Sequence, residues 1–127
     1  MRTVHTDAYT SFVDLAKQQV RGVDYEIEVH RHTASQVAII APHGGGIERG
    51  TSEIARSIAG EDFNLYAFEG LKSSGNYAAL HLTSRHFDEP ACLGLIAQCS
   101  FVIAIHVCRG RGEKVLLGGL DHALKAQ

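Results

Sequence analysis

Apolar residues recur along the chain in the patterns of buried and half-buried strands. Two continuous apolar runs, QVAIIA at 36–41 and FVIAIHV at 101–107, are typical of strands that are covered on both faces. Residues 24–32 alternate apolar side chains with glutamate and histidine, which predicts a half-buried strand. Two further strands are expected at 63–68 and 78–84.

Helical spacing of apolar residues predicts helices between these strands. The expected helices cover residues 6–20, 51–60, 88–99 and 120–127. Thr51 or Ser52 suits the N-cap of the second helix, Gly60 suits its end, and Pro90 suits the first turn of the third. The alternation of strands and helices predicts a three-layer α/β/α domain over residues 1–127, with a mixed, largely parallel sheet. The last expected helix is short, which indicates either a brief terminal helix or one piece of a larger fold.

Length and composition are those of an ordinary globular protein. The chain has 127 residues, of which 45% are hydrophobic and 20% are charged. A chain of this size can bury a core without disulfide support. The formal net charge is -2 at pH 7, and acids and bases are mixed along the sequence. Because there is no basic stripe, binding driven by nucleic-acid phosphates is not expected.

Cysteine usage and the N-terminal residues bear on the cellular compartment. The three cysteines are an odd number without a C-x-x-C pair, so a reducing cytosol fits better than a disulfide framework. The N-terminal residues lack the apolar core of a signal peptide, and no run approaches the ~18 apolar residues of a membrane span. We therefore expect a cytoplasmic protein with no membrane partner.

The glycine-rich stretch APHGGGIERGTSE, residues 41–53, raises two hypotheses about a ligand. A phosphate is disfavoured, because Arg49 stands where a dinucleotide-binding turn needs its third glycine. In a P-loop alignment, Thr51 replaces the essential lysine and Glu48 brings a negative charge into the phosphate cradle. Only the anion-binding character of a helix N-terminus then remains in favour of phosphate.

A metal ion is the second hypothesis. His43 lies just beyond the strand at 36–41, and Glu48 follows across three glycines that could bend the two side chains towards one point. His106 lies near the end of the other buried strand, so neighbouring strands would present the two histidines side by side. Two histidines and one carboxylate are a common ligand set of catalytic zinc. The spacing of His43 and Glu48 is not a specific motif, so a plain turn with a hydrogen-bonded histidine stays open.

Other polar residues could assist such a site. Asn76 and Arg85 could bind the carboxylates of an anionic substrate, Arg85 through bidentate pairing, or they could be ordinary surface residues. His81 could support the site or be a satisfied, partly buried histidine. Cys108 follows His106 by two residues, which leaves a Cys-His hydrolase as an outside alternative that lacks an orienting group.

Four blocks of the sequence together are more specific than any single motif. In chain order they read APHGGGIERGTSEIA, NYAALHLTSRHFDEP, AIHVCRGRGE and LLGGLD. Together they resemble the poly-gamma-glutamate hydrolase family, also labelled phage-related replication protein, which occurs in bacteria and their phages. The resemblance runs from Val37 to Ala123 and implies a zinc carboxypeptidase-like α/β fold.

The resemblance also implies a chemistry. It places zinc ligands on His43, Glu48 and His106, and it implies hydrolysis of γ-glutamyl amide bonds in poly-gamma-glutamate, a polyanionic polymer. The family usually has glycine where this chain has Val107. The glutamate expected as general base belongs to a further C-terminal stretch, so no catalytic residue is assigned in this chain and the fold is expected to lack its C-terminal part. Two alternatives stay open: a non-catalytic metal-binding remnant of the fold, and a zinc amidase that acts on peptidoglycan.

Overall fold

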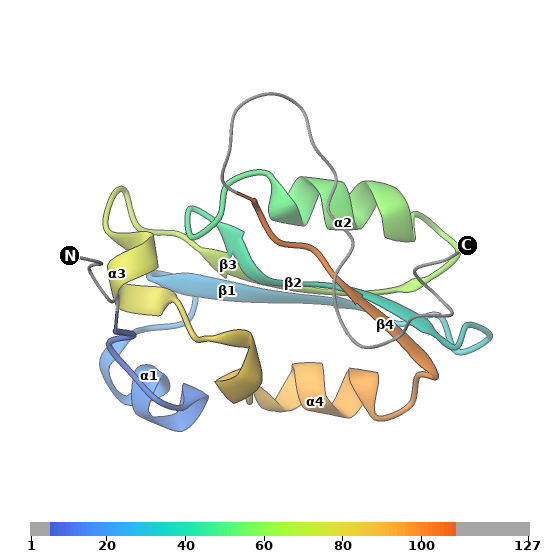
Figure 1. Cartoon of the computed structure of the whole chain (residues 1–127), viewed down its shortest axis with the longest axis horizontal. Coiled ribbons are helices and arrows are strands. Elements are labelled where there is room, and N and C mark those ends of the chain that lie inside the picture. Colours follow the sequence, from blue (N-terminus) through green and yellow to red (C-terminus); the bar gives the residue numbers. More distant parts are fainter. Residues whose placement is uncertain (1–5, 109–127) are drawn as a thin grey trace.

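The computed structural model describes residues 6–108, which form a four-stranded sheet with helices on both sides (Figure 1). The strands are β1 (Tyr25–His30), β2 (Val37–Gly45), β3 (Asn64–Gly70) and β4 (Phe101–Ala104). They lie in the order β1-β3-β2-β4. β2 pairs in parallel with both β3 and β4, whereas β1 pairs antiparallel with β3. The expected mixed, largely parallel sheet is confirmed.

Helices cover the two faces of this sheet. They are α1 (Phe12–Gln18), α2 (Thr51–Ala59), α3 (Asn76–Leu80), α4 (Pro90–Ile96) and the 3₁₀ helix η1 (Ser84–His86). α2 lies on one face, and α1 and α4 lie on the other (Figure 1). Because helices lie on both faces of the sheet, the expected three-layer α/β/α arrangement is confirmed. Among the helices of the described residues, none has the length and apolar character that a membrane crossing requires.

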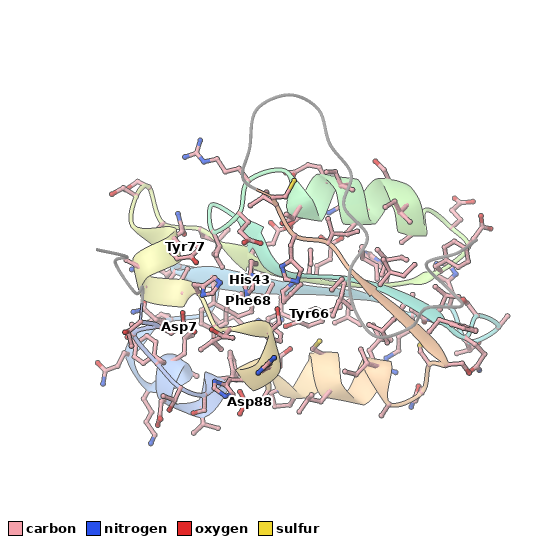
Figure 2. The ribbon with its side chains drawn as sticks, in the orientation of Figure 1. Asp7, His43, Tyr66, Phe68, Tyr77 and Asp88 are labelled. Atoms are coloured by element: carbon pink, nitrogen blue, oxygen red, sulfur yellow. The ribbon has the colours of Figure 1, made fainter. Side chains whose placement is uncertain are left out.

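Apolar cores form on both faces, because successive side chains of a strand point to opposite sides of the sheet. In β2, Ile39 and Ala41 pack with Ala55 of α2, whereas Ala38 and Ile40 belong to the core on the opposite face. That opposite core also contains Leu15 of α1, Leu95 of α4, and Tyr66 and Phe68 of β3, the last two labelled in Figure 2. Both faces of β2 are therefore covered, which explains its continuous apolar run.

The strand predicted at 78–84 is wrong. This stretch holds the end of α3, an extended segment and the start of η1. Leu80, the last residue of α3, and Leu82, in the extended segment, are both fully buried. Two buried leucines at a spacing of two imitate the period of a strand. Gly75, which precedes α3 with a left-handed backbone (φ 75°), marks the true start of the helix.

The prediction of a strongly buried strand at 101–107 is wrong in extent and in burial. β4 ends at Ala104, and its four residues are exposed. It lies at the edge of the described sheet, where β2 is its only partner. The helix expected at 6–20 is confined to Phe12–Gln18. The helix expected at 120–127 lies outside the described residues.

Candidate metal centre

The glycine-rich stretch continues β2 rather than following it. β2 extends to Gly45, and its register against β3 shifts between Ala41 and Gly44. His43 therefore lies inside an irregular part of the strand, and not beyond the strand as predicted. A Cβ atom on Gly44 would lie 2.8 Å from the carbonyl oxygen of Phe68, so glycine is needed for this close approach. The result is that His43 is held inside the fold, 2% exposed.

Backbone and hydroxyl contacts fold the stretch after His43 back on itself. The backbone N–H of Glu48 donates to the His43 carbonyl (2.8 Å), and Thr51 Oγ1 donates to the Glu48 carbonyl (2.9 Å). Ser52 Oγ accepts from a glycine N–H of the same turn (3.2 Å). The prediction that Thr51 or Ser52 caps α2 is wrong, because Gly50 holds the N-cap position and both hydroxyls support the turn.

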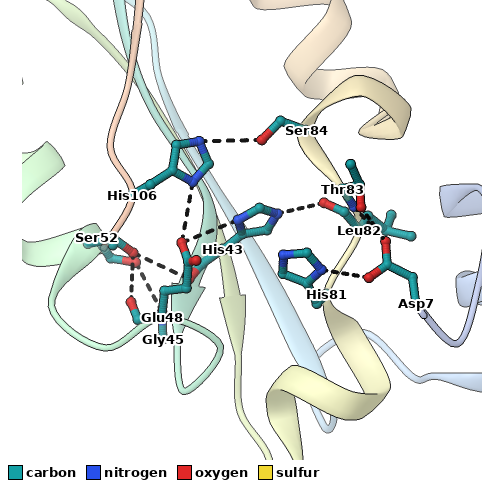
Figure 3. A network of polar contacts seen from close by, with 11 residues as sticks. Asp7, His43, Gly45, Glu48, Ser52, His81, Leu82, Thr83, Ser84 and His106 are labelled. Atoms are coloured by element: carbon teal, nitrogen blue, oxygen red, sulfur yellow. Dashed lines mark hydrogen bonds and ion pairs between the residues drawn. The ribbon is translucent and has the colours of Figure 1, made fainter. Parts of the chain in front are cut away.

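His43, Glu48 and His106 meet at the carboxyl ends of β2 and β4 (Figure 3). Nδ1 of His43 and Nδ1 of His106 each lie 3.3 Å from Oε1 of Glu48. The N–H of Ile105 donates to the Ile40 carbonyl (2.9 Å), so the chain after β4 still runs beside β2 and carries His106 to the site. The candidate ligand atoms all lie within 4.8 Å of one another, and this is the one such group among residues 6–108.

The outer nitrogens of both histidines have partners of their own. Nε2 of His43 donates to the Leu82 carbonyl (2.6 Å). A carbonyl can only accept, so this nitrogen carries a proton. Nε2 of His106 lies 3.4 Å from Ser84 Oγ. Burial lowers the pKa of His43, which favours the neutral imidazole. Nδ1 of His43 is then an unprotonated acceptor that faces the Glu48 carboxylate.

Acceptor atoms that converge in this way favour a cation between them. The lone pair on His43 Nδ1 and the anionic oxygen of Glu48 repel each other unless a positive charge lies nearby. Imidazole nitrogen and carboxylate oxygen are ligands that zinc accepts. A metal-binding histidine also typically donates its other N–H to a carbonyl or a similar acceptor, as His43 does here. The donor set therefore fits a zinc ion.

A further histidine ring lies against His43. The ring centroids of His43 and His81 are 4.2 Å apart, and Tyr77 stacks on His81 at 4.3 Å. Nδ1 of His81 lies 2.7 Å from Oδ1 of Asp7, 74 residues away in the sequence. The side chain of His81 is 13% exposed, so it is both satisfied and in contact with the site. Sequence reasoning missed Asp7, because no local pattern relates it to His81.

The two predicted substrate-binding residues have different surroundings. Arg85 is exposed on η1 and makes no hydrogen bond or ion pair with other residues in the range 6–108. Asn76 is buried. Its amide group accepts from the Lys72 N–H (2.9 Å) and donates to the Lys72 carbonyl (2.8 Å). Asn76 thus closes the loop before α3, and a substrate role for either residue stays a prediction.

Several known proteins are similar in sequence to most of this chain. A family model described as poly-gamma-glutamate hydrolase matches residues 9–127. UPF0714 protein YndL of Bacillus subtilis (strain 168) is 42% identical over 120 residues, which cover 94% of this chain and 46% of YndL. The SPbeta prophage-derived UPF0714 protein YoqZ of the same organism is 39% identical over 121 residues, which cover 95% of this chain and 43% of YoqZ. The chain thus spans less than half the length of these curated relatives.

Two solved structures share the fold. A bacteriophage poly-gamma-glutamate hydrolase is 38% identical and superposes with a TM-score of 0.74, over 78% of this chain and 47% of its own. A zinc-free apo form of YndL is 42% identical and has a TM-score of 0.72, with the same shares covered. Both comparisons agree with the α/β architecture described above.

Proposed function

The chain belongs to the poly-gamma-glutamate hydrolase family, and on that premise we propose that it is a zinc-dependent hydrolase of γ-glutamyl amide bonds in poly-gamma-glutamate. The observation that carries the proposal is the convergence of two imidazole nitrogens and one carboxylate oxygen within 4.8 Å. Catalytic zinc sites use three protein ligands of these kinds and keep a further position for water. The description of the family and of the bacteriophage neighbour supports the polymer as substrate.

The residues of the chain prepare the site for the metal. When bound, zinc would polarise the scissile carbonyl and lower the pKa of a water molecule to about 7. Burial keeps His43 neutral, and the Leu82 carbonyl holds the proton on Nε2, which leaves Nδ1 for the metal. The side chain of His106 is 35% exposed, and we propose that the polymer approaches the cluster from that side.

Arg85 is the residue that we propose for binding the polymer. It directly follows Ser84, whose hydroxyl lies 3.4 Å from His106 Nε2, and it is exposed. Poly-gamma-glutamate carries a free carboxylate on every residue, and a guanidinium binds a carboxylate through two parallel hydrogen bonds. Asn76 would act indirectly, by supporting the glycine turn between His43 and Glu48. Its amide group packs so closely against Gly46 of that turn that a Cβ atom on Gly46 would lie 2.3 Å from the amide nitrogen.

A non-catalytic metal-binding domain is the second candidate. Glu48 lies in the candidate metal cluster, where its carboxylate would bind the ion. With Glu48 bound to the ion, the three-residue cluster would hold no further carboxylate to take a proton from the attacking water. A general base is typically worth about 10²–10⁴-fold in rate, so its absence would leave a site that binds metal with little turnover.

One experiment on the full 127-residue chain tests both candidates. The purified protein is analysed for bound zinc and incubated with poly-gamma-glutamate, and the polymer length is followed by size-exclusion chromatography. We expect one zinc per chain and a shortened polymer. His43→Ala and His106→Ala should abolish both results. His30→Ala is the matched control, because His30 lies on β1 with a side chain that is 61% exposed.

Each contrary outcome has a distinct meaning. Stoichiometric zinc with an unchanged polymer would replace the hydrolase by the non-catalytic metal-binding domain. Cleavage of peptidoglycan fragments in place of the polymer would identify an amidase on the same site. Protein without zinc, unaffected by His43→Ala, would refute the metal centre.

A further inference from the structure

One short segment contacts both metal-binding histidines from outside. This segment, residues 81–84, connects the end of α3 to the start of η1. The Leu82 carbonyl accepts from His43 Nε2 (2.6 Å), and Ser84 Oγ lies 3.4 Å from His106 Nε2. The orientation of both histidines therefore depends on where the 81–84 segment is held.

Asp7 holds this segment through both of its carboxylate oxygens (Figure 3). Oδ2 accepts from the backbone N–H of Thr83 (2.7 Å) and from Thr83 Oγ1 (2.9 Å). Oδ1 lies 2.7 Å from Nδ1 of His81. Burial raises the pKa of Asp7, but the hydrogen bonds from His81 and Thr83 outweigh it and leave that pKa below its usual value. The carboxylate is thus charged and fully engaged near neutral pH.

The peptide unit between Leu82 and Thr83 joins Asp7 to the metal centre. Its N–H donates to Asp7 and its carbonyl accepts from His43. The N–H and C=O of a trans peptide point in opposite directions from one rigid plane, and this peptide is trans. A charged acceptor on the N–H side therefore fixes the direction of the carbonyl, and successive hydrogen bonds in such a chain strengthen one another.

We propose that Asp7 is a positioning residue of the metal centre: it fixes the 82–83 peptide plane, whose carbonyl keeps the proton of His43 on Nε2 and leaves Nδ1 for the metal. Asp7 also fixes the ring of His81, which lies 4.2 Å from the ring of His43. The inference rests on the metal site proposed above. It adds that a residue at the start of the chain, remote in sequence from every ligand, sets the affinity of that site.

The test compares Asp7→Ala and Asp7→Asn with the unchanged chain. Asp14→Asn is the matched control, because it removes a carboxylate from α1 whose side chain is 52% exposed. Zinc affinity is measured by competition with a chromophoric chelator. Loss of an outer partner of a metal ligand typically weakens binding by about 10–100-fold. Asp7→Ala displaces that partner, the Leu82 carbonyl, without removing it, so we expect a loss at the lower end of this range, about 10-fold. The zinc affinity of Asp7→Asn should lie between those of the unchanged chain and Asp7→Ala, because the single carbonyl oxygen of asparagine cannot replace both carboxylate oxygens.

A second readout reports on His43 without any metal. Nitrogen-15 NMR of the imidazole rings in the zinc-free protein distinguishes which ring nitrogen carries the proton. We expect His43 to be protonated on Nε2 in the unchanged chain and in Asp14→Asn. In Asp7→Ala and Asp7→Asn the two tautomers should both be populated. A thermal melt of each variant records its stability separately.

The outcomes separate this proposal from the proposed function. Zinc affinities of both Asp7 variants within about twofold of the unchanged chain, with an unaltered His43 tautomer, would overturn the proposal even if stability falls. If the unchanged chain binds no zinc, the proposed function fails, and the NMR comparison still decides the role of Asp7. If Asp7→Ala does not fold, Asp7→Asn and Thr83→Val, which removes one of the donors to Asp7, decide it.

Discussion

Replacing Gly45 by alanine should destabilise the fold more than replacing a glycine of similar backbone conformation elsewhere. Gly45 lies between His43 and Glu48 with a left-handed backbone (φ 60°). A Cβ atom there would lie 2.5 Å from the carbonyl oxygen and 2.7 Å from the nitrogen of Gly70. Both contacts are with backbone of β3, which cannot move aside as a flexible side chain could.

The expected magnitude has two parts. Left-handed backbone costs an alanine about 1–2 kcal/mol relative to its preferred conformations. Forcing extra atoms into a packed region costs about 1–3 kcal/mol more. Gly22 isolates the first part, because its φ is 86° and a Cβ atom there would meet nothing within 4 Å. We therefore expect Gly22→Ala to cost about 1–2 kcal/mol and Gly45→Ala about 2–5 kcal/mol of unfolding free energy.

Urea denaturation followed by circular dichroism measures both variants, with the midpoint interpreted at an unchanged slope. Zinc affinity of Gly45→Ala should also fall, since the displaced turn carries both His43 and Glu48, whereas Gly22→Ala should bind zinc as the unchanged chain does. Equal destabilisation by the two substitutions would show that the approach of β2 to β3 at Gly45 is not a steric constraint.

Three further predictions concern other parts of the chain. The side-chain amide of Asn64 accepts from the His32 N–H (2.7 Å) and donates to the carbonyls of Ser35 (3.2 Å) and Val37 (3.1 Å). Asn64→Ala leaves these groups unpaired, so it should lower the free energy of unfolding by about 1–3 kcal/mol in urea denaturation. A change within experimental error would contradict this. The pKa of Asp7 is lowered in the folded chain, so the unfolded chain binds more protons in acid. The stability contributed by the Asp7 carboxylate is therefore present above the usual pKa of 3.8 and is lost as pH falls through the lower folded value. Asp7→Asn should flatten the acid side of a plot of unfolding free energy against pH, and an unchanged plot would speak against this. Burial, with a smaller contribution from Glu89, raises the pKa of Cys92 to about 12, whereas Cys108 is exposed. A thiol reagent at pH 8 should therefore modify Cys108 and leave Cys92 unmodified until the protein is denatured. Mass analysis of the peptides measures both modifications.

Some elements could be predicted because their sequence pattern follows directly from burial. β2 is covered on both faces, so it had to be apolar at successive positions, and the run at 36–41 indicated it. α2 was expected at 51–60 and extends over Thr51–Ala59, because Gly60 ends it. Prediction failed where a local pattern had two explanations. Leu80 and Leu82 satisfy the period of a strand, yet they reach one core from a helix end and an extended segment.

The sequence by itself predicted the donor set of the candidate metal centre. Imidazole and carboxylate chemistry, together with strand ends beside glycines, singled out His43, Glu48 and His106, and these three form the cluster. Only the tertiary structure decided how the cluster is held. The Leu82 carbonyl is a backbone atom and has no sequence signature, and Asp7 meets Thr83 across 76 residues of chain. Ligand chemistry belongs to single residues and can be read from them, whereas the direction of a peptide plane depends on contacts that only the folded chain brings together.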